Sequence, residues 1–153
     1  MHSKTKADLA PQSFYTVTAE IALARHQPRI AALQYAAAAS NETDVQILER
    51  ASQVASDSLQ PSLAEKVAAR WTQVDPKSLD AQRAAARAAL ALHKIDQAAT
   101  HYHTVITSLP TGTEVELAEL ETYLAGNDNI FGARQFADRL ASSFPDSAAA
   151  LRM

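Results

Sequence analysis

Apolar residues recur along this chain at intervals of three and four positions, the spacing of one face of an α-helix. Residues 78–94 show this spacing and predict one helix. Residues 97–109 predict a second helix, whose apolar face holds Ala98, Tyr102 and Val105. The period-two alternation of a strand is rare in this sequence. The pattern therefore predicts an all-α protein made of helices joined by short turns.

Prolines interrupt the helical pattern at regular intervals. Proline disfavours helix at the residue before it and has no backbone N–H to donate. In this chain 34 positions separate Pro76 from Pro110, and 35 separate Pro110 from Pro145. A constant period of this length is typical of helical repeats. We expect four helix-turn-helix segments, at about 12–42, 43–76, 77–110 and 111–145.

The two ends of the chain fall outside this period. Residues 1–11 have no apolar core that would make them a signal peptide, and we expect a flexible N-terminal segment there. Residues 146–153 follow Pro145 as the start of a further helix, which we expect to be cut short. This end suggests a fragment of a longer chain.

Composition supports the helical interpretation and excludes several kinds of chemistry. The apolar share is 47%, rich in Ala and Leu, and the chain has 3 Gly and no Cys. Without Cys there is no disulfide, no Cys-ligated zinc and no thiol catalysis. The net charge of −3 argues against a non-specific nucleic-acid binder, and no apolar run approaches membrane-spanning length. A chain free of Cys is compatible with the cytoplasm or with a bacterial periplasm.

The period and several residue types resemble those of the tetratricopeptide repeat family. That family has a 34-residue helix-turn-helix unit with a small residue in each helix, an aromatic in the second helix and a closing proline. The matching positions in the third segment are Ala86, Ala98, Tyr102 and Pro110. The other segments match at Ala19, Ala31 and Tyr35 (first), Ser52, Ala64 and Pro76 (second), and Ala133 and Pro145 (fourth). The helix-turn glycine of the family is absent from the first three segments. The stretch "ILERASQVAS" further resembles tetratricopeptide repeat proteins of proteobacterial envelopes.

The resemblance implies an α-solenoid, a right-handed superhelix of helix pairs. In the family the first helix of each pair lines a concave groove that binds a peptide or a helix of another protein. In this register the groove-facing residues are Thr16, Glu20, Gln46, Glu49, Gln53, Arg83 and Arg87.

Arg83 and Arg87 lie four positions apart, on one face of a predicted helix. Two guanidinium groups there could hold a carboxylate of a partner. The alternative is a solubilising pair that meets Glu49 or Asp80.

The remaining polar residues form no catalytic or metal-binding pattern, so we expect no cofactor. His101 and His103 are two positions apart on a helix, so their side chains diverge and do not share a metal ion. The carboxylates of Glu114, Glu116, Glu119 and Glu121 gather near one helix start, where a solvated face is the expected interpretation. The single tryptophan, Trp71, is expected to belong to the core.

Three functions are compatible with these patterns. The first is a non-catalytic scaffold that binds a protein or peptide partner in the groove. The second is a structural module that stacks on another copy through its terminal helices. The third is a substrate-recruiting part of a longer enzyme.

Overall fold

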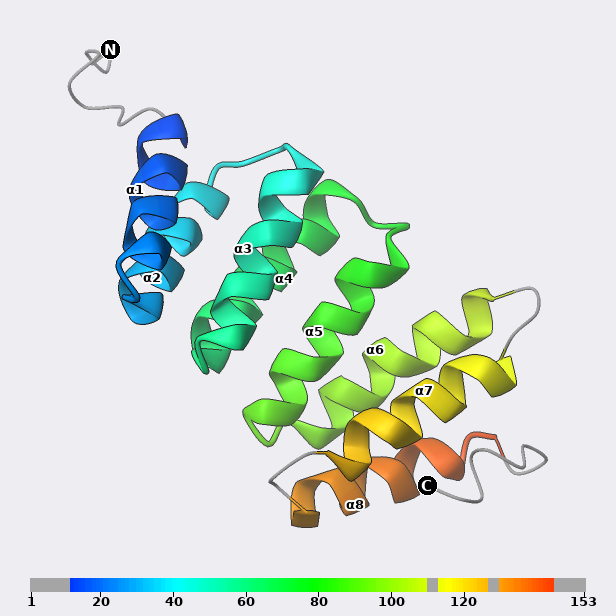
Figure 1. Cartoon of the computed structure of the whole chain (residues 1–153). Coiled ribbons are helices and arrows are strands. Elements are labelled where there is room, and N and C mark those ends of the chain that lie inside the picture. Colours follow the sequence, from blue (N-terminus) through cyan, green and yellow to red (C-terminus); the bar gives the residue numbers. More distant parts are fainter. Residues whose placement is uncertain (1–11, 110–112, 127–129, 145–153) are drawn as a thin grey trace. The chain divides into compact units, whose positions relative to one another are not determined.

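The structure is a computed structural model that describes residues 12–109, 113–126 and 130–144. Over these residues the chain is helical and has no strand, so the all-α prediction is confirmed (Figure 1). The expected flexible segment 1–11, the expected further helix in 146–153, and the closing residues Pro110 and Pro145 lie outside the described residues. The eight described helices are α1 (Gln12–Ala24), α2 (Pro28–Ala39), α3 (Val45–Asp57), α4 (Pro61–Val74), α5 (Leu79–Ala91), α6 (Ile95–Ser108), α7 (Thr113–Ala125) and α8 (Ile130–Ala141).

The chain divides into two compact units. Unit 1 is Met1–Lys77 and contains α1 to α4, and unit 2 is Ser78–Met153 and contains α5 to α8. Within each unit consecutive helices pack against each other as hairpins. The second helix of the first hairpin, α2 or α6, also contacts both helices of the hairpin that follows. Each unit is therefore built around a central helix.

Three hairpin turns close in the same way. His26, Leu59 and His93 have φ angles of 57°, 55° and 60°, in the left-handed region that usually favours glycine. The next residue of each turn donates its backbone N–H to a carbonyl five positions earlier: Gln27 to Ala22 (2.8 Å), Gln60 to Ala55 (3.0 Å) and Lys94 to Ala89 (2.9 Å). The left-handed residues of these turns lie 33 and 34 positions apart, close to the period of the prolines. In each of the first three hairpins this turn position holds a residue other than glycine.

Helix starts follow the local sequence. Asp44 accepts a hydrogen bond from the Gln46 backbone N–H (2.9 Å), and the Ser78 hydroxyl accepts one from Ala81 (3.1 Å). Both side chains satisfy a backbone donor that has no partner within its own helix. Pro28 and Pro61 are the first residues of α2 and α4, where a missing N–H costs no helical bond.

The core of unit 1 relies on small residues that let helices approach closely. Ala19, Ala31, Ala38 and Ala51 are fully buried where helices meet. Trp71 in α4 is 4% exposed, so its expected place in the core is confirmed. Its indole Nε1 has no hydrogen-bond partner among the described residues.

The core of unit 2 is one cluster supplied by all four of its helices. Its largest fully buried side chains are Phe136, Ile106, Leu117, Leu120 and Leu140. The ring of Tyr102 lies against that of Phe136, with centroids 5.7 Å apart. Aromatic pairs at this separation add to the stabilisation from burial alone.

Candidate partner-binding surfaces

The seven residues predicted to face a groove all lie on first helices of hairpins. Thr16 and Glu20 are on α1, Gln46, Glu49 and Gln53 are on α3, and Arg83 and Arg87 are on α5. Five of them therefore belong to unit 1 and two to unit 2. The structure gives each unit its own candidate surface.

In unit 1, Glu20 joins three helices. Its carboxylate accepts hydrogen bonds from the Tyr35 hydroxyl on α2 and from Arg50 on α3, whose Nε lies 3.1 Å from Oε1. Arg50 and then Tyr35 lower the pKa of the Glu20 carboxyl. Burial, together with the Glu20 carboxylate, raises the pKa of Tyr35. Glu20 is thus a link between helices, although half of its side chain remains exposed.

The other predicted residues of unit 1 lie on exposed or half-buried surface. The Gln53 amide donates to Asp57 one turn later (2.8 Å), and the Thr16 hydroxyl donates to the Ser13 carbonyl (3.1 Å). Gln46 and Glu49 are exposed on α3. Together with Glu20 they make a polar surface along the first helices of unit 1.

In unit 2, Arg83 is a structural residue. Its Nε and one terminal nitrogen donate to the two oxygens of Glu116 on α7, at 2.7 and 2.8 Å, and its other terminal nitrogen donates to Asp80 (2.8 Å). The side chain of Arg83 is 24% exposed and that of Glu116 only 8%. The Glu116 carboxylate raises the pKa of Arg83 above its usual value. Of the alternatives for Arg83, pairing with Asp80 is present, but Glu116 is the main partner.

The expectation of a solvated carboxylate face on α7 is wrong for Glu116. A buried carboxylate requires a positive partner, and Arg83 supplies two hydrogen bonds in the planar geometry that suits a guanidinium. The spacing contains a signal for this pair, because Glu116 follows Arg83 by 33 positions and Arg50 follows Glu20 by 30. In both cases an opposite-charge pair about one repeat apart joins the first helices of neighbouring hairpins.

Arg87, one helical turn after Arg83 on α5, is the more exposed of the two arginines. Its guanidinium carbon lies 4.8 Å from the ring centroid of Tyr123 on α7, a cation–π contact. It also lies near the Tyr102 hydroxyl. Burial raises the pKa of Tyr102, and Arg87 opposes that rise. Arg87 therefore contacts the ring of Tyr123 and is still exposed.

The two histidines of α6 have separate surroundings. The Nδ1 atom of His101 lies 2.7 Å from Oε1 of Gln82 on α5, and burial lowers the pKa of His101. His103 is exposed and its ring stacks near Phe144, with centroids 5.5 Å apart. Within the described residues no three His, Asp or Glu side chains gather as metal ligands would.

A shallow depression of about 250 Å³ lies between α6 and α8. Asp96 and Arg139 pair across it at 3.4 Å, and threonine and serine side chains make up much of its wall. It lies on second helices, away from the predicted residues. It is smaller than most ligand pockets, which occupy about 300 to 1,000 Å³.

Among the described helices none is long and apolar enough to cross a membrane. No protein-family model, no curated protein and no solved structure matches this chain. The tetratricopeptide resemblance therefore stays a prediction, based on the period and on the residue types named above.

Proposed function

We propose that this chain is a protein-interaction module of the tetratricopeptide type, in which first helices of successive hairpins present a surface to a peptide or helix of a partner. The main support for this proposal is the α5–α7 surface of unit 2, where Arg83 binds Glu116 and Arg87 stacks on Tyr123. These contacts link α5 to α7 through their side chains. A preorganised surface loses less conformational entropy on binding than a mobile one.

The charge of this surface indicates the chemistry of the partner segment. Arg83 is already neutralised by two carboxylates, whereas Arg87 is held by a ring and is exposed. A carboxylate of the partner would pair with Arg87 through charge-assisted hydrogen bonds. The partner segment in this proposal is therefore acidic.

The proposal includes an α-solenoid with a right-handed superhelical twist. The three turns with the same backbone closure, 33 and 34 positions apart, support a repeating unit of this kind. An experimental structure of the whole chain tests this part, since a left-handed or irregular stacking of the hairpins would contradict it.

Affinity capture from an extract of the source cell tests the function, with the whole chain and two single variants as baits. Arg87→Glu reverses the exposed charge and removes the contact with Tyr123, but it leaves both residues of the Arg83–Glu116 pair in place. Lys66→Glu makes the same change at an exposed position of α4 and is the matched control. We expect a partner that the wild type and Lys66→Glu retain and Arg87→Glu loses. Equal retention by all three baits would rule out the α5–α7 surface, and no partner at all would contradict the module.

A further inference from the structure

Most of the large apolar side chains that unit 1 leaves exposed gather on one hairpin. Of the eight that are exposed among the described residues, five belong to α1 and α2. We call them the α1–α2 apolar patch: Phe14, Val17, Ile21, Ile30 and Leu33, with exposed fractions between 45% and 57%. Single exposed apolar residues are ordinary, whereas a group of them marks an interaction surface.

The patch lies on the outer sides of both helices. Phe14, Val17 and Ile21 follow each other at spacings of three and four, on the side of α1 opposite the buried Ala19 and Ala22. Ile30 and Leu33 likewise lie opposite the buried Tyr35 on α2. Both helices are therefore apolar on two sides, although unit 1 covers only one of them. A helix that is apolar all round is normally buried all round.

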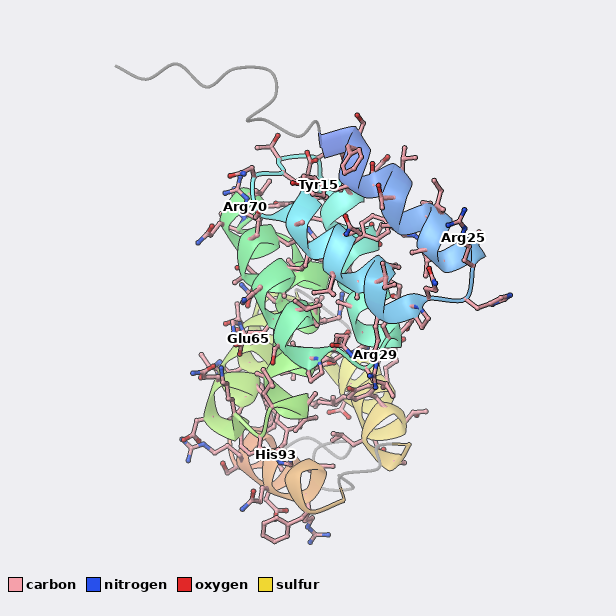
Figure 2. All side chains as sticks on the ribbon, turned by 90° about the vertical axis from the view of Figure 1, so that its left-hand side faces the viewer. Tyr15, Arg25, Arg29, Glu65, Arg70 and His93 are labelled. Carbon is pink, nitrogen blue, oxygen red and sulfur yellow. The ribbon has the colours of Figure 1, made fainter. Side chains whose placement is uncertain are left out.

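Charges frame the patch at its two ends. Arg25 and Arg29 lie at the turn between α1 and α2, at the opposite end of α1 from Tyr15 (Figure 2). The far end of α2 leads into Glu42 and the exposed Asp44. There the Glu42 carboxylate accepts the backbone N–H groups of Thr43 and Asp44, and Arg70 donates to the Glu42 carbonyl. Between the ends, the only charge on the two helices is Glu20, which Arg50 neutralises.

We propose that the α1–α2 apolar patch binds the same patch of a second copy of this chain, as a two-fold symmetric dimer. In such an interface the two-fold axis lies in the plane of contact. An axis parallel to the helices would bring the two arginine-bearing turns together. An axis perpendicular to the helices, passing across their middle, instead places each arginine-bearing turn against the Asp44 end of the other copy. The charge pattern selects this second, antiparallel arrangement, in which α1 meets α1.

The size of the hairpin suits a weak, reversible dimer. Each helix is about 20 Å long and about 10 Å wide, so the face of two such helices covers about 400 Å², less than the roughly 600 Å² that each partner buries in the smaller stable interfaces. Burying the five side chains would also remove their apolar surface from water, which is the main driving force of association.

Sedimentation velocity of the whole chain over a range of concentrations tests the proposal. We expect a reversible dimer for the wild type. Leu33→Glu places a charge in the patch, and we expect it to raise the dimer dissociation constant at least tenfold. Val115→Glu makes the same kind of change at a similarly exposed residue of α7 and should leave the constant unchanged. A wild type that stays monomeric at millimolar concentration, or a Leu33→Glu variant that dimerises normally, would overturn the proposal.

Disulfide cross-linking tests the antiparallel geometry. Because the chain has no cysteine, an introduced cysteine is the only thiol that can form a disulfide. Val17 lies near the middle of α1, where the two-fold axis passes. A Val17→Cys variant should therefore form an intermolecular disulfide under mild oxidation, while Val115→Cys should not. Cross-linking of both variants to the same extent would contradict the geometry. The dimer does not depend on the proposed partner surface, so Arg87→Glu should dimerise like the wild type.

Discussion

Leu59 occupies a backbone conformation that suits glycine better. Its φ of 55° crowds the Cβ atom, at a cost of about 1–2 kcal/mol for a residue with a side chain. The side chain is 83% exposed and so contributes little packing in return. We expect Leu59→Gly to raise the free energy of unfolding by about 1 kcal/mol. Glycine also increases the conformational entropy of the unfolded chain, which offsets part of the gain. Urea denaturation followed by circular dichroism measures the change.

The control for this substitution is Ala69→Gly, at an exposed position inside α4. There the backbone is helical, and glycine should lower the free energy of unfolding by about 1 kcal/mol. Opposite signs for the two glycine variants are the expected result. Destabilisation by both would mean that the turn after α3 does not require the left-handed conformation.

His101 should make stability depend on pH. Burial lowers its pKa from 6.5, so the unfolded chain binds a proton more readily than the folded protein does. The stabilisation that neutral His101 gives the folded protein is therefore fully present above about pH 6.5. It is lost as the pH falls through the lower pKa of His101 in the folded state. We expect His101→Gln to flatten the decline in the free energy of unfolding between pH 7.5 and 5.5. Identical pH profiles of wild type and variant would exclude this role.

At the scale of elements, the Arg83–Glu116 pair ties α5 to α7. Arg83→Met would leave the Glu116 carboxylate nearly buried without its guanidinium, and we expect a loss of about 2 to 3 kcal/mol in the free energy of unfolding. The double variant with Glu116→Gln should recover part of that loss, because the unpaired charge is gone. A double-mutant cycle measures the coupling, which we expect to exceed about 1 kcal/mol.

The matched control for the cycle is the Arg134–Asp138 pair on α8. Both side chains are more than half exposed and lie one helical turn apart, at 3.2 Å. Exposed pairs of this kind contribute about 0.3 to 0.5 kcal/mol. If Arg83→Met cost no more than Arg134→Met, the tie between α5 and α7 would carry no stabilisation of its own.

The helices could be predicted from the sequence better than the contacts between them. Alanine and leucine at helical spacing indicate α5, and Ser78 marks its start, because both signals are local. The burial of Glu116 depends on a residue 33 positions earlier, so a local count of carboxylates could not show it. A turn after residues 78–94 is predicted, but the left-handed backbone of His93 is not, because the turn has none of the glycine that usually signals it.

At the scale of the whole molecule, the period predicts hairpins but gives no sign of two units. The boundary after Lys77 falls between two segments that look alike in sequence, with Pro76 at an ordinary position of the repeat. A division of this kind depends on how side chains of different helices pack, which periodicity does not describe. For the same reason the predicted surface residues separate into one set on α1 and α3 and another on α5.

Unit 2 should fold without unit 1. Its main core cluster, which includes Phe136, draws every member from within residues 78–153, and so does the Arg83–Glu116 pair. We expect the fragment 78–153 to be helical and to unfold in one cooperative thermal transition by circular dichroism. Because Phe→Ala in a core costs about 3–5 kcal/mol, most of what a domain of this size gains on folding, Phe136→Ala should abolish that transition. A fragment that shows no transition even before the substitution would mean that the core of unit 2 depends on unit 1.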